Sequence, residues 1–304
     1  MRAPDLTAAE IFERYEEVRP RLPAATFPAS ARKIANLSDI AGEIDVFLLD
    51  AFGVLNVGET AIPGAVERIR DLETMGKKVF VVTNAASYRA GAAVEKYRSF
   101  GFGFLPEQVI SSRDAMLNGL EAYPDNFLWG VAALETAGIE EIPANVQLLG
   151  RDAALYDAVD GFILLSAADW DDARQDMLLT AIEKRPRPVV VGNPDLVAPR
   201  EWGLSREPGF FAHAIADAVG VEPDFYGKPY LPVFERALLR PDIAAIPRAR
   251  IAMVGDTLHT DILGGAAAGL KTVLVAGHGL LKGEDIPALI EKSGIVPDFI
   301  AETT

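Results

Sequence analysis

The chain has 304 residues, of which 50% are hydrophobic and 8% aromatic, and it carries a formal net charge of −15 at pH 7. This length and apolar content suffice for one or two buried cores, because domains usually contain about 100 to 200 residues. The acidic balance argues against binding to nucleic acid or to an anionic membrane surface, since both require a basic face. The chain has no cysteine, which excludes disulfides and a cysteine nucleophile and is typical of a reducing compartment.

The N-terminal residues 1–20 (MRAPDLTAAEIFERYEEVRP) carry acidic residues early and have no long apolar segment, so they do not resemble a signal peptide. Their pattern predicts an amphipathic helix. No later stretch approaches about 18 uninterrupted apolar residues, so no membrane span is expected. A cytoplasmic location is therefore predicted.

Short apolar runs then alternate with helical patterns. Residues 46–49 and 79–82 are predicted to be strands, and each is followed by a helical pattern. The same alternation resumes near the C-terminus over residues 249–277. It predicts an α/β fold with a Rossmann-like, doubly wound parallel sheet that is covered by helices on both faces.

Four further strand patterns lie between these two parts of the predicted sheet, at residues 126–131, 145–150, 160–166 and 187–195. They are more than an extra sheet edge needs, so the sequence predicts a second α/β domain inserted into the first. The predicted core is residues 1–86 and 222–304, with residues 1–40 as an N-terminal helical extension. The predicted inserted domain is residues 87–221.

Polar residues follow several predicted strands. In doubly wound sheets ligands bind beyond the carboxyl ends of the strands, so polar side chains at those ends are candidates for a site. Each of them could also be an ordinary helix cap or turn residue. Together and in chain order, they indicate a functional site: Asp50, Thr83 with Asn84, Lys228, and Asp256 with Asp261.

This order resembles the four motifs of the haloacid dehalogenase (HAD) superfamily, whose members are mostly magnesium-dependent phosphatases: Asp50, Thr83-Asn84, Lys228-Pro229 and GDTLHTD from Gly255. The insertion resembles the C2 cap of class IIA, which contains nitrophenylphosphatase-like, phosphoglycolate and pyridoxal phosphatases. The segment GNPDLVAP (residues 192–199) resembles a stretch common in that class. The resemblance runs from Asp45 to Phe299 and implies a small phosphorylated metabolite as substrate and a homodimer formed through the cap.

The chemistry of phosphoryl transfer suggests a role for each motif residue, because its catalysis is mainly positioning and charge stabilisation. Asp50 is expected to attack phosphorus and form an aspartyl phosphate. The Thr83 hydroxyl, the Asn84 backbone N–H and the Lys228 ammonium are expected to bind the phosphoryl oxygens.

A magnesium ion prefers oxygen ligands and keeps several waters, so one or two carboxylates suffice to hold it. Asp50 and Asp256 suit this role, and the resemblance implies the backbone carbonyl of Phe52 as a third ligand. Two interpretations of Asp261 remain open. It orients Lys228, or it is an acid that complements the dipole at a helix N-terminus.

Phe52 departs from the motif of the superfamily's phosphatases, which usually have Asp two residues after the nucleophile as acid and base. Phenylalanine has no transferable proton, and general acid–base assistance is typically worth about 10²–10⁴ in rate. One hypothesis is a slow or specialised phosphohydrolase that acts on aryl or acyl phosphates or takes its proton from another group, with His259 as a candidate. The alternative is a phosphate-ligand-binding protein that has lost catalysis.

Substrate selectivity is expected in the inserted domain, since closure of such a domain completes the site. At least one of its polar or aromatic residues near strand ends is expected to contact substrate, although each could instead serve packing or capping: Asp169, Trp170, Asn193, Asp195, Arg200 and Trp202.

Overall fold

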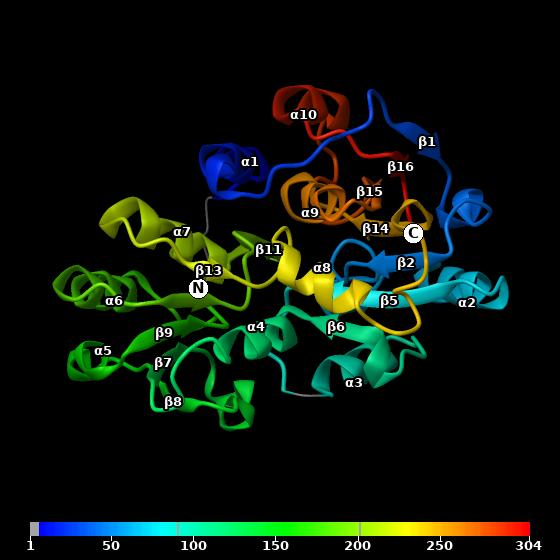
Figure 1. Cartoon of the computed structure of the whole chain (residues 1–304). Coiled ribbons are helices and arrows are strands. Elements are labelled where there is room, and N and C mark those ends of the chain that lie inside the picture. The colour runs from blue at the N-terminus through cyan, green and yellow to red at the C-terminus, as the bar shows by residue number, and fades with distance from the viewer. Residues whose placement is uncertain (1–5, 90, 201) are drawn as a thin grey trace.

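The computed structural model describes residues 6–89, 91–200 and 202–304, and its two main sheets are both parallel and covered by helices (Figure 1). The core sheet has seven strands in the order β1-β16-β15-β14-β2-β5-β6. This arrangement confirms the predicted Rossmann-like α/β core. The strands are β1 (Arg32–Ile34), β2 (Val46–Leu49), β5 (Lys78–Thr83), β6 (Val109–Ser111), β14 (Ile251–Gly255), β15 (Lys271–Val275) and β16 (Phe299–Ala301).

The central strand β2 is buried on both faces, which explains its continuous apolar sequence. Phe47 and Leu49 pack on one face, and Val46 and Leu48 pack on the other, because successive side chains of a strand alternate. The first face is covered by α2 (Ala65–Thr74) and α3 (Ala92–Ser99). The second face is covered by α4 (Ser112–Leu120) and α8 (Leu231–Leu238).

The cap has a five-stranded parallel sheet in the order β13-β10-β9-β7-β8. Its strands are β7 (Leu128–Ala132), β8 (Asn145–Leu148), β9 (Gly161–Leu164), β10 (Val189–Val191) and β13 (Asp224–Phe225). One face packs against three helices, α5 (Ala153–Ala158), α6 (Asp172–Lys184) and α7 (Pro208–Val219). The other face packs against α4, so this helix contacts both sheets.

Two strands belong to a different sheet from the one that the predicted domain boundaries imply. β6 lies inside the predicted cap range of 87–221 but pairs with β5 in the core sheet. β13 lies inside the predicted core range but pairs with β10 in the cap sheet. Strands this short have no periodic pattern, so the sequence could not assign them to a sheet.

Two antiparallel hairpins complete the strands of the described ranges. The first joins β3 (Asn56–Val57) to β4 (Thr60–Ala61) and follows β2 closely. The second joins β11 (Val197–Arg200) to β12 (Gly203–Arg206) in the cap.

The N-terminal helix α1 (Ala8–Glu17) begins with a capping box, in which Thr7 accepts from the Glu10 N–H and Glu10 accepts from the Thr7 N–H. Its buried face joins an apolar cluster with α9 (Leu263–Ala267) and α10 (Ile286–Ser293). Figure 1 shows α1 between these core helices and the cap helix α7. In the ranges that the structure describes, no helix has the length and apolarity needed to span a membrane.

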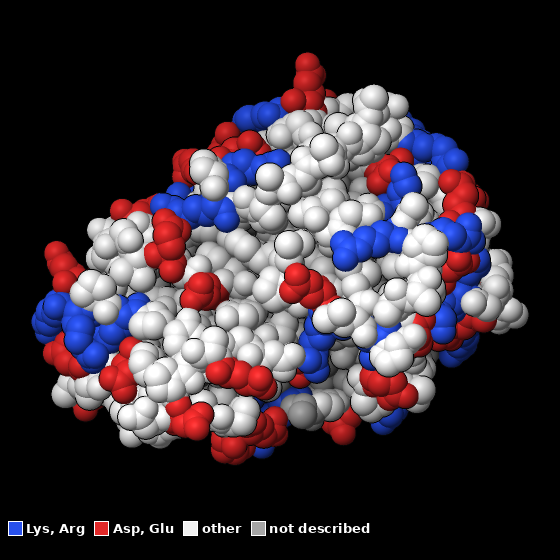
Figure 2. Space-filling view, in the orientation of Figure 1, with Lys and Arg blue, Asp and Glu red and all other residues white. Residues whose placement is uncertain are grey.

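Acidic and basic side chains are interspersed on the face of the molecule drawn in Figure 2, and its middle is largely uncharged. The negative net charge therefore does not come from one acidic patch on this face. The face also presents no continuous basic surface of the kind that binds nucleic acid.

His213 of α7 is buried in the cap, and we expect its burial to make the stability of the protein depend on pH. Its ring stacks on Phe225 with centroids 4.9 Å apart, and burial, assisted by Arg21 and Arg14 against Asp217, lowers its pKa to about 4. As the pH falls below about 6.5, His213 is protonated in the unfolded chain but stays neutral in the folded protein. The stability of the folded state is therefore unaffected by this group above pH 6.5 and falls as the pH drops toward 4. Between pH 7 and 5 we expect a loss of about 2 kcal/mol in the free energy of unfolding.

Urea unfolding of the wild type and of His213→Gln at pH 7 and pH 5 measures this contribution. The wild type should lose more stability than the variant over this range, because glutamine does not titrate. Equal losses in the two proteins would assign the pH dependence to other groups.

Candidate active site

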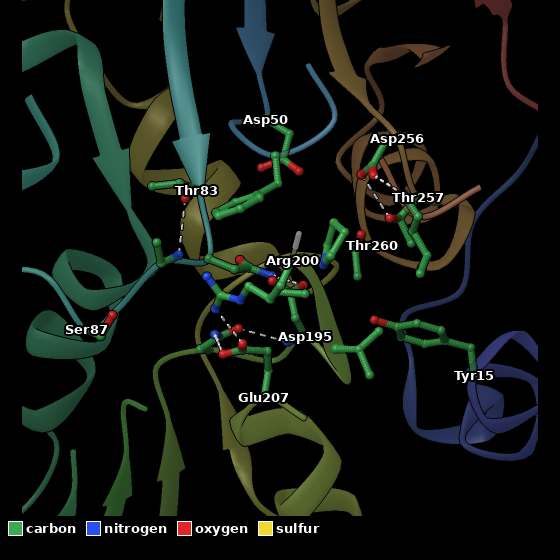
Figure 3. A pocket seen from close by; sticks show the side chains of 18 of the residues that line it. Tyr15, Asp50, Thr83, Ser87, Asp195, Arg200, Glu207, Asp256, Thr257 and Thr260 are labelled. Atoms are coloured by element: carbon green, nitrogen blue, oxygen red, sulfur yellow. Dashed lines mark hydrogen bonds and ion pairs between the residues drawn. The ribbon is translucent and has the colours of Figure 1, made fainter. Parts of the chain in front are cut away.

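The carboxyl ends of three adjacent core strands form one edge, where the candidate site lies (Figure 3). Asp50 follows β2, Asp256 follows β14, and Thr83 is the last residue of β5. Leu49 pairs with Val254 and with Val81, so the strand ends are in register. Parallel pairing therefore brings together side chains that are 33 to 206 residues apart in the chain, as the numbering shows.

Lys228 is buried beside two of the carboxylates. Its Nζ lies 2.6 Å from Asp50 Oδ1 and 2.7 Å from Asp261 Oδ1. Asn84 holds the lysine backbone, since its Oδ1 accepts from the Lys228 N–H at 2.7 Å and its Nδ2 donates to the Lys228 carbonyl at 2.9 Å. A side chain at Gly227 would collide with this amide, because its Cβ would lie 2.3 Å from Asn84 Oδ1.

The two acidic residues of the GDTLHTD segment are held by neighbouring donors. Asp256 accepts from the Thr257 hydroxyl at 3.0 Å and from the Leu280 N–H at 2.7 Å. Asp261 accepts from the Thr257 N–H at 3.1 Å and from Lys228. Gly279 has a φ of +75° and approaches Asp256 so closely that a Cβ would lie 1.7 Å from its Oδ2. The carboxylate positions therefore depend on glycine at this turn.

The charges of this cluster do not balance within the protein. Carboxylate oxygens of Asp50, Asp256 and Asp261 lie within 4.8 Å of one another, with the single ammonium of Lys228 against them. Burial raises the pKa of Asp50 to about 6 although Lys228 opposes it, and burial with Asp261 raises that of Asp256 well above its usual range. Burial alone would lower the pKa of Lys228, but Asp261 and Asp50 outweigh it and raise that pKa.

This excess of buried negative charge fits a bound cation. The donor atoms are carboxylate oxygens, which are the ligands that Mg²⁺ prefers. The cluster therefore suits a magnesium ion.

Asp50, Thr83 and Asp256 line a pocket of about 80 Å³ that is also lined by residues of the cap. Asn193, Asp195 and Arg200 line it from the cap side. Asp195 accepts from Asn84 Nδ2 at 2.8 Å, and burial raises its pKa to about 8 against the influence of Lys228. The cap segment is thus hydrogen-bonded directly to the residue that holds Lys228.

A buried carboxylate, Glu207, organises the cap side of the pocket. It accepts from Asn193 Nδ2 at 3.2 Å, from Arg200 at 2.9 Å and from the Ser205 hydroxyl at 2.7 Å. Glu207 comes two residues before a glycine and follows no predicted strand, so its sequence context gave no signal of a site. Together these groups form a polar wall that is able to bind hydroxyl groups.

Phe52 lines the same pocket. Two cations lie over its ring. Lys96 Nζ is 5.4 Å and the Arg200 guanidinium carbon is 5.6 Å from the ring centroid. Such distances are typical of cation–π contacts. The phenylalanine is therefore packed into the site, between a core helix and the cap.

Three of the residues suggested by sequence lie outside this pocket. Trp170 is buried in the apolar core of the cap and donates to Gln175 at 3.0 Å, so its role is packing, which is one of the two interpretations that its sequence left open. Asp169 lies at the cap surface and pairs with Arg174 at 2.8 Å. Trp202 is 45% exposed and lines a neighbouring groove.

The hypothesis that His259 replaces the missing acid is also contradicted. The side chain is 1% exposed, and its Nε2 bonds the Glu16 carboxylate of α1. Phe12 and Tyr15 pack against its ring. These contacts hold the imidazole against the N-terminal helix, and His259 does not line the pocket that contains Asp50.

Comparisons with known proteins agree with this fold and site. Residues 47–147 match a family described as haloacid dehalogenase-like hydrolase, and residues 225–303 match a HAD-hydrolase-like family. The chain is 30% identical to human glycerol-3-phosphate phosphatase over 87% of this chain and 90% of that protein. It therefore belongs to the haloacid dehalogenase-like hydrolase family, and the predicted class IIA resemblance is confirmed.

Two solved structures with the same fold superimpose on this chain. A possible sugar phosphatase of the HAD superfamily from Cytophaga hutchinsonii superimposes with a TM-score of 0.78 at 26% identity, over 90% of this chain and 98% of that one. A glycerol phosphate phosphatase from Mycobacterium tuberculosis, solved in complex with calcium, gives a TM-score of 0.64 at 26% identity, over 79% and 68%. The chain is thus an enzyme of the HAD hydrolase type, and its named relatives are phosphatases.

Proposed function

We propose that this protein is a magnesium-dependent phosphohydrolase that acts on a small phosphorylated metabolite through an aspartyl phosphate on Asp50. The observation that carries the proposal is the contact of Lys228 Nζ with Asp50 at 2.6 Å, beside Asp256 and at the end of the strand that bears Thr83. A nucleophile and a cation so placed suit a tetrahedral anion that binds between them.

Asp50 and Asp256 would hold the magnesium ion, together with the Phe52 carbonyl implied by the family resemblance. When bound, the ion supplies positive charge next to the phosphoryl oxygens and the nucleophile. Asp261 then pairs with Lys228 and keeps the ammonium pointed at Asp50.

In the proposed reaction an Asp50 oxygen attacks phosphorus, the bond from phosphorus to the leaving oxygen breaks, and that oxygen takes up a proton from water. Lys228 and the Thr83 hydroxyl bind the phosphoryl oxygens as their charge builds up. A water molecule then attacks the aspartyl phosphate, which releases inorganic phosphate and restores the carboxylate.

The leaving group would lie against Phe52 and the polar wall around Glu207. The names of the relatives, glycerol-3-phosphate phosphatase and sugar phosphatase, favour a leaving group with hydroxyls. Asn193 and Arg200 at the pocket wall support the same class of substrate. A homodimer through the cap stays a prediction of the resemblance.

Phe52 favours the second candidate, a phosphate-binding protein without turnover, because no carboxyl group stands at that position. Phosphate release measured with p-nitrophenyl phosphate and glycerol 3-phosphate, with Mg²⁺ and with EDTA, separates the two. The enzyme should release phosphate only with the metal and above the level of Asp50→Asn. Binding of inorganic phosphate without any such release would support the second function.

Phe52→Asp should raise kcat for glycerol 3-phosphate about 10- to 100-fold, because its alkoxide leaving group needs a proton. This gain is below the full effect of general acid–base assistance, about 10²–10⁴, since Lys96 and Arg200 would favour the ionised form of the new carboxyl group. With p-nitrophenyl phosphate, whose leaving group needs little protonation, the gain should be smaller.

Phe52→Asn is the matched control, because it removes the ring without supplying a proton. Thermal unfolding of both variants shows whether loss of the packed ring has damaged the fold. Equal kcat values for the two variants would mean that proton transfer does not limit the reaction.

A further inference from the structure

The N-terminal helix α1 contacts the turn that carries the acidic residues of the site. The His259 ring of that turn stacks on Tyr15 at 4.9 Å and meets Phe12 edge-on at 5.0 Å. Glu16 bonds the same imidazole. Because His259 lies between Asp256 and Asp261 in the chain, α1 is anchored on the core directly behind the carboxylates.

The same helix and the segment that follows it also bind the cap. Arg14 and Arg21 both pair with Asp217 of α7, Arg21 at 2.6 Å. On the pocket side, the Leu196 N–H donates to the Tyr15 hydroxyl at 3.2 Å. Leu196 directly follows Asp195, so α1 connects the acidic turn of the core to the cap segment that lines the pocket.

Tyr15 lines the pocket itself, together with Asp50, Asp195 and Asp256. Figure 3 shows it extending from the N-terminal helix toward the other labelled side chains. Its hydroxyl accepts from Leu196, and a phenol also has one hydrogen to donate. Among the described residues no acceptor is seen for that hydrogen, although the side chain is only 3% exposed.

We propose that Tyr15 is a specificity-determining residue, whose hydroxyl donates a hydrogen bond to an oxygen of the leaving group. The inference rests on the proposed function and adds the class of substrate, a phosphate ester with a free hydroxyl near the phosphate. A buried donor without a partner disfavours a ligand that cannot accept its hydrogen, because the donor then stays unpaired. Helix α1 keeps the phenol in place because it is bonded to both domains.

Tyr15→Phe tests the proposal, since it keeps the ring on His259 and removes the hydroxyl. The bond from the Leu196 N–H is lost as well, and that loss should affect all substrates alike. With glycerol 3-phosphate we expect kcat/KM to fall about 10-fold, which corresponds to one hydrogen bond. With p-nitrophenyl phosphate, which has no hydroxyl, kcat/KM should change by less than about 2-fold. Tyr156→Phe is the control, because this cap tyrosine donates to the Gly150 carbonyl away from the pocket.

Binding keeps this test independent of turnover. In the Asp50→Asn background, calorimetry with Mg²⁺ should show about 10-fold weaker binding of glycerol 3-phosphate when Tyr15→Phe is added. The affinity for inorganic phosphate should not change. If the wild type shows no turnover but the two Asp50→Asn proteins differ in binding as expected, the proposed hydrolysis is overturned and the role of Tyr15 is supported.

Two results would overturn the role of Tyr15. One is an equal loss of kcat/KM with both substrates, which would indicate a general structural effect. The other is unchanged binding of glycerol 3-phosphate in the double variant, with a melting temperature that matches Asp50→Asn.

Discussion

Asp50→Asn is expected to lower kcat for phosphate release by at least about 10³-fold, because the amide cannot attack phosphorus and loss of a nucleophile has effects of this size or larger. The amide is nearly isosteric with the carboxylate. Its oxygen can therefore still accept a hydrogen bond from Lys228 Nζ, which lies 2.6 Å from Asp50 Oδ1 in the wild type. The measurement is steady-state phosphate release at saturating Mg²⁺.

The same substitution should affect stability in the opposite direction. It removes one of three clustered carboxylates, two of them buried and that of Asp50 partly buried, so the metal-free variant is expected to unfold at the same or a higher temperature than the metal-free wild type. Mg²⁺ should stabilise the variant less, since a ligand that binds the folded state more weakly stabilises it less at the same concentration. Asp125→Asn, at an exposed position, is the matched control. Wild-type turnover by Asp50→Asn would disprove the aspartyl-phosphate mechanism.

Lys228→Met is expected to destabilise the metal-free protein by about 3 to 5 kcal/mol at pH 8, because removing one partner leaves buried charges uncompensated. Lys228 is 1% exposed and is the cation in contact with Asp50 and Asp261. Without the ammonium the folded-state pKa of Asp50, which burial already raises to about 6, rises further. Stability is then present at low pH and is lost as the pH rises through that pKa, so the variant should recover as the pH falls from 8 to 6.

Urea unfolding of the single and double variants at both pH values measures this effect. Adding Asp261→Asn to Lys228→Met should restore part of the lost stability, since it removes one of the unpaired charges. Lys33→Met, at an exposed position of β1, should leave stability within about 0.5 kcal/mol. A cost below about 1 kcal/mol for Lys228→Met would mean that the ammonium does not neutralise this cluster.

The sequence was sufficient to predict four of the seven core strands, β2, β5, β14 and β15, and the order of the motif residues, but not the short strands β1, β6 and β16. Val46–Leu49 and Ile251–Gly255 are buried on both faces, and such strands have continuous apolar sequences that end in a polar residue. An inserted domain is likewise present. It was predictable because each of its longer strands has its own apolar run.

The short strands β6 and β13 could not be assigned, since pairing with a distant partner and not local pattern decides their sheet. The residues of the cap were also ambiguous. Trp170 and Asn193 are both reasonable pocket residues from their sequence context, but packing places the first in an apolar core and the second beside Glu207.

Local sequence therefore determined the parallel core, its inserted cap and the residues at the strand ends, because strand period and strand-end polarity are properties of a few consecutive residues. Only the tertiary structure brought α1 to the pocket, buried His259 and placed Tyr15 beside Asp195. Those contacts join segments more than 180 residues apart, as the separations of 181 and 243 show. They depend on how the cap, the core and the N-terminal helix pack together, which no short pattern in the chain encodes.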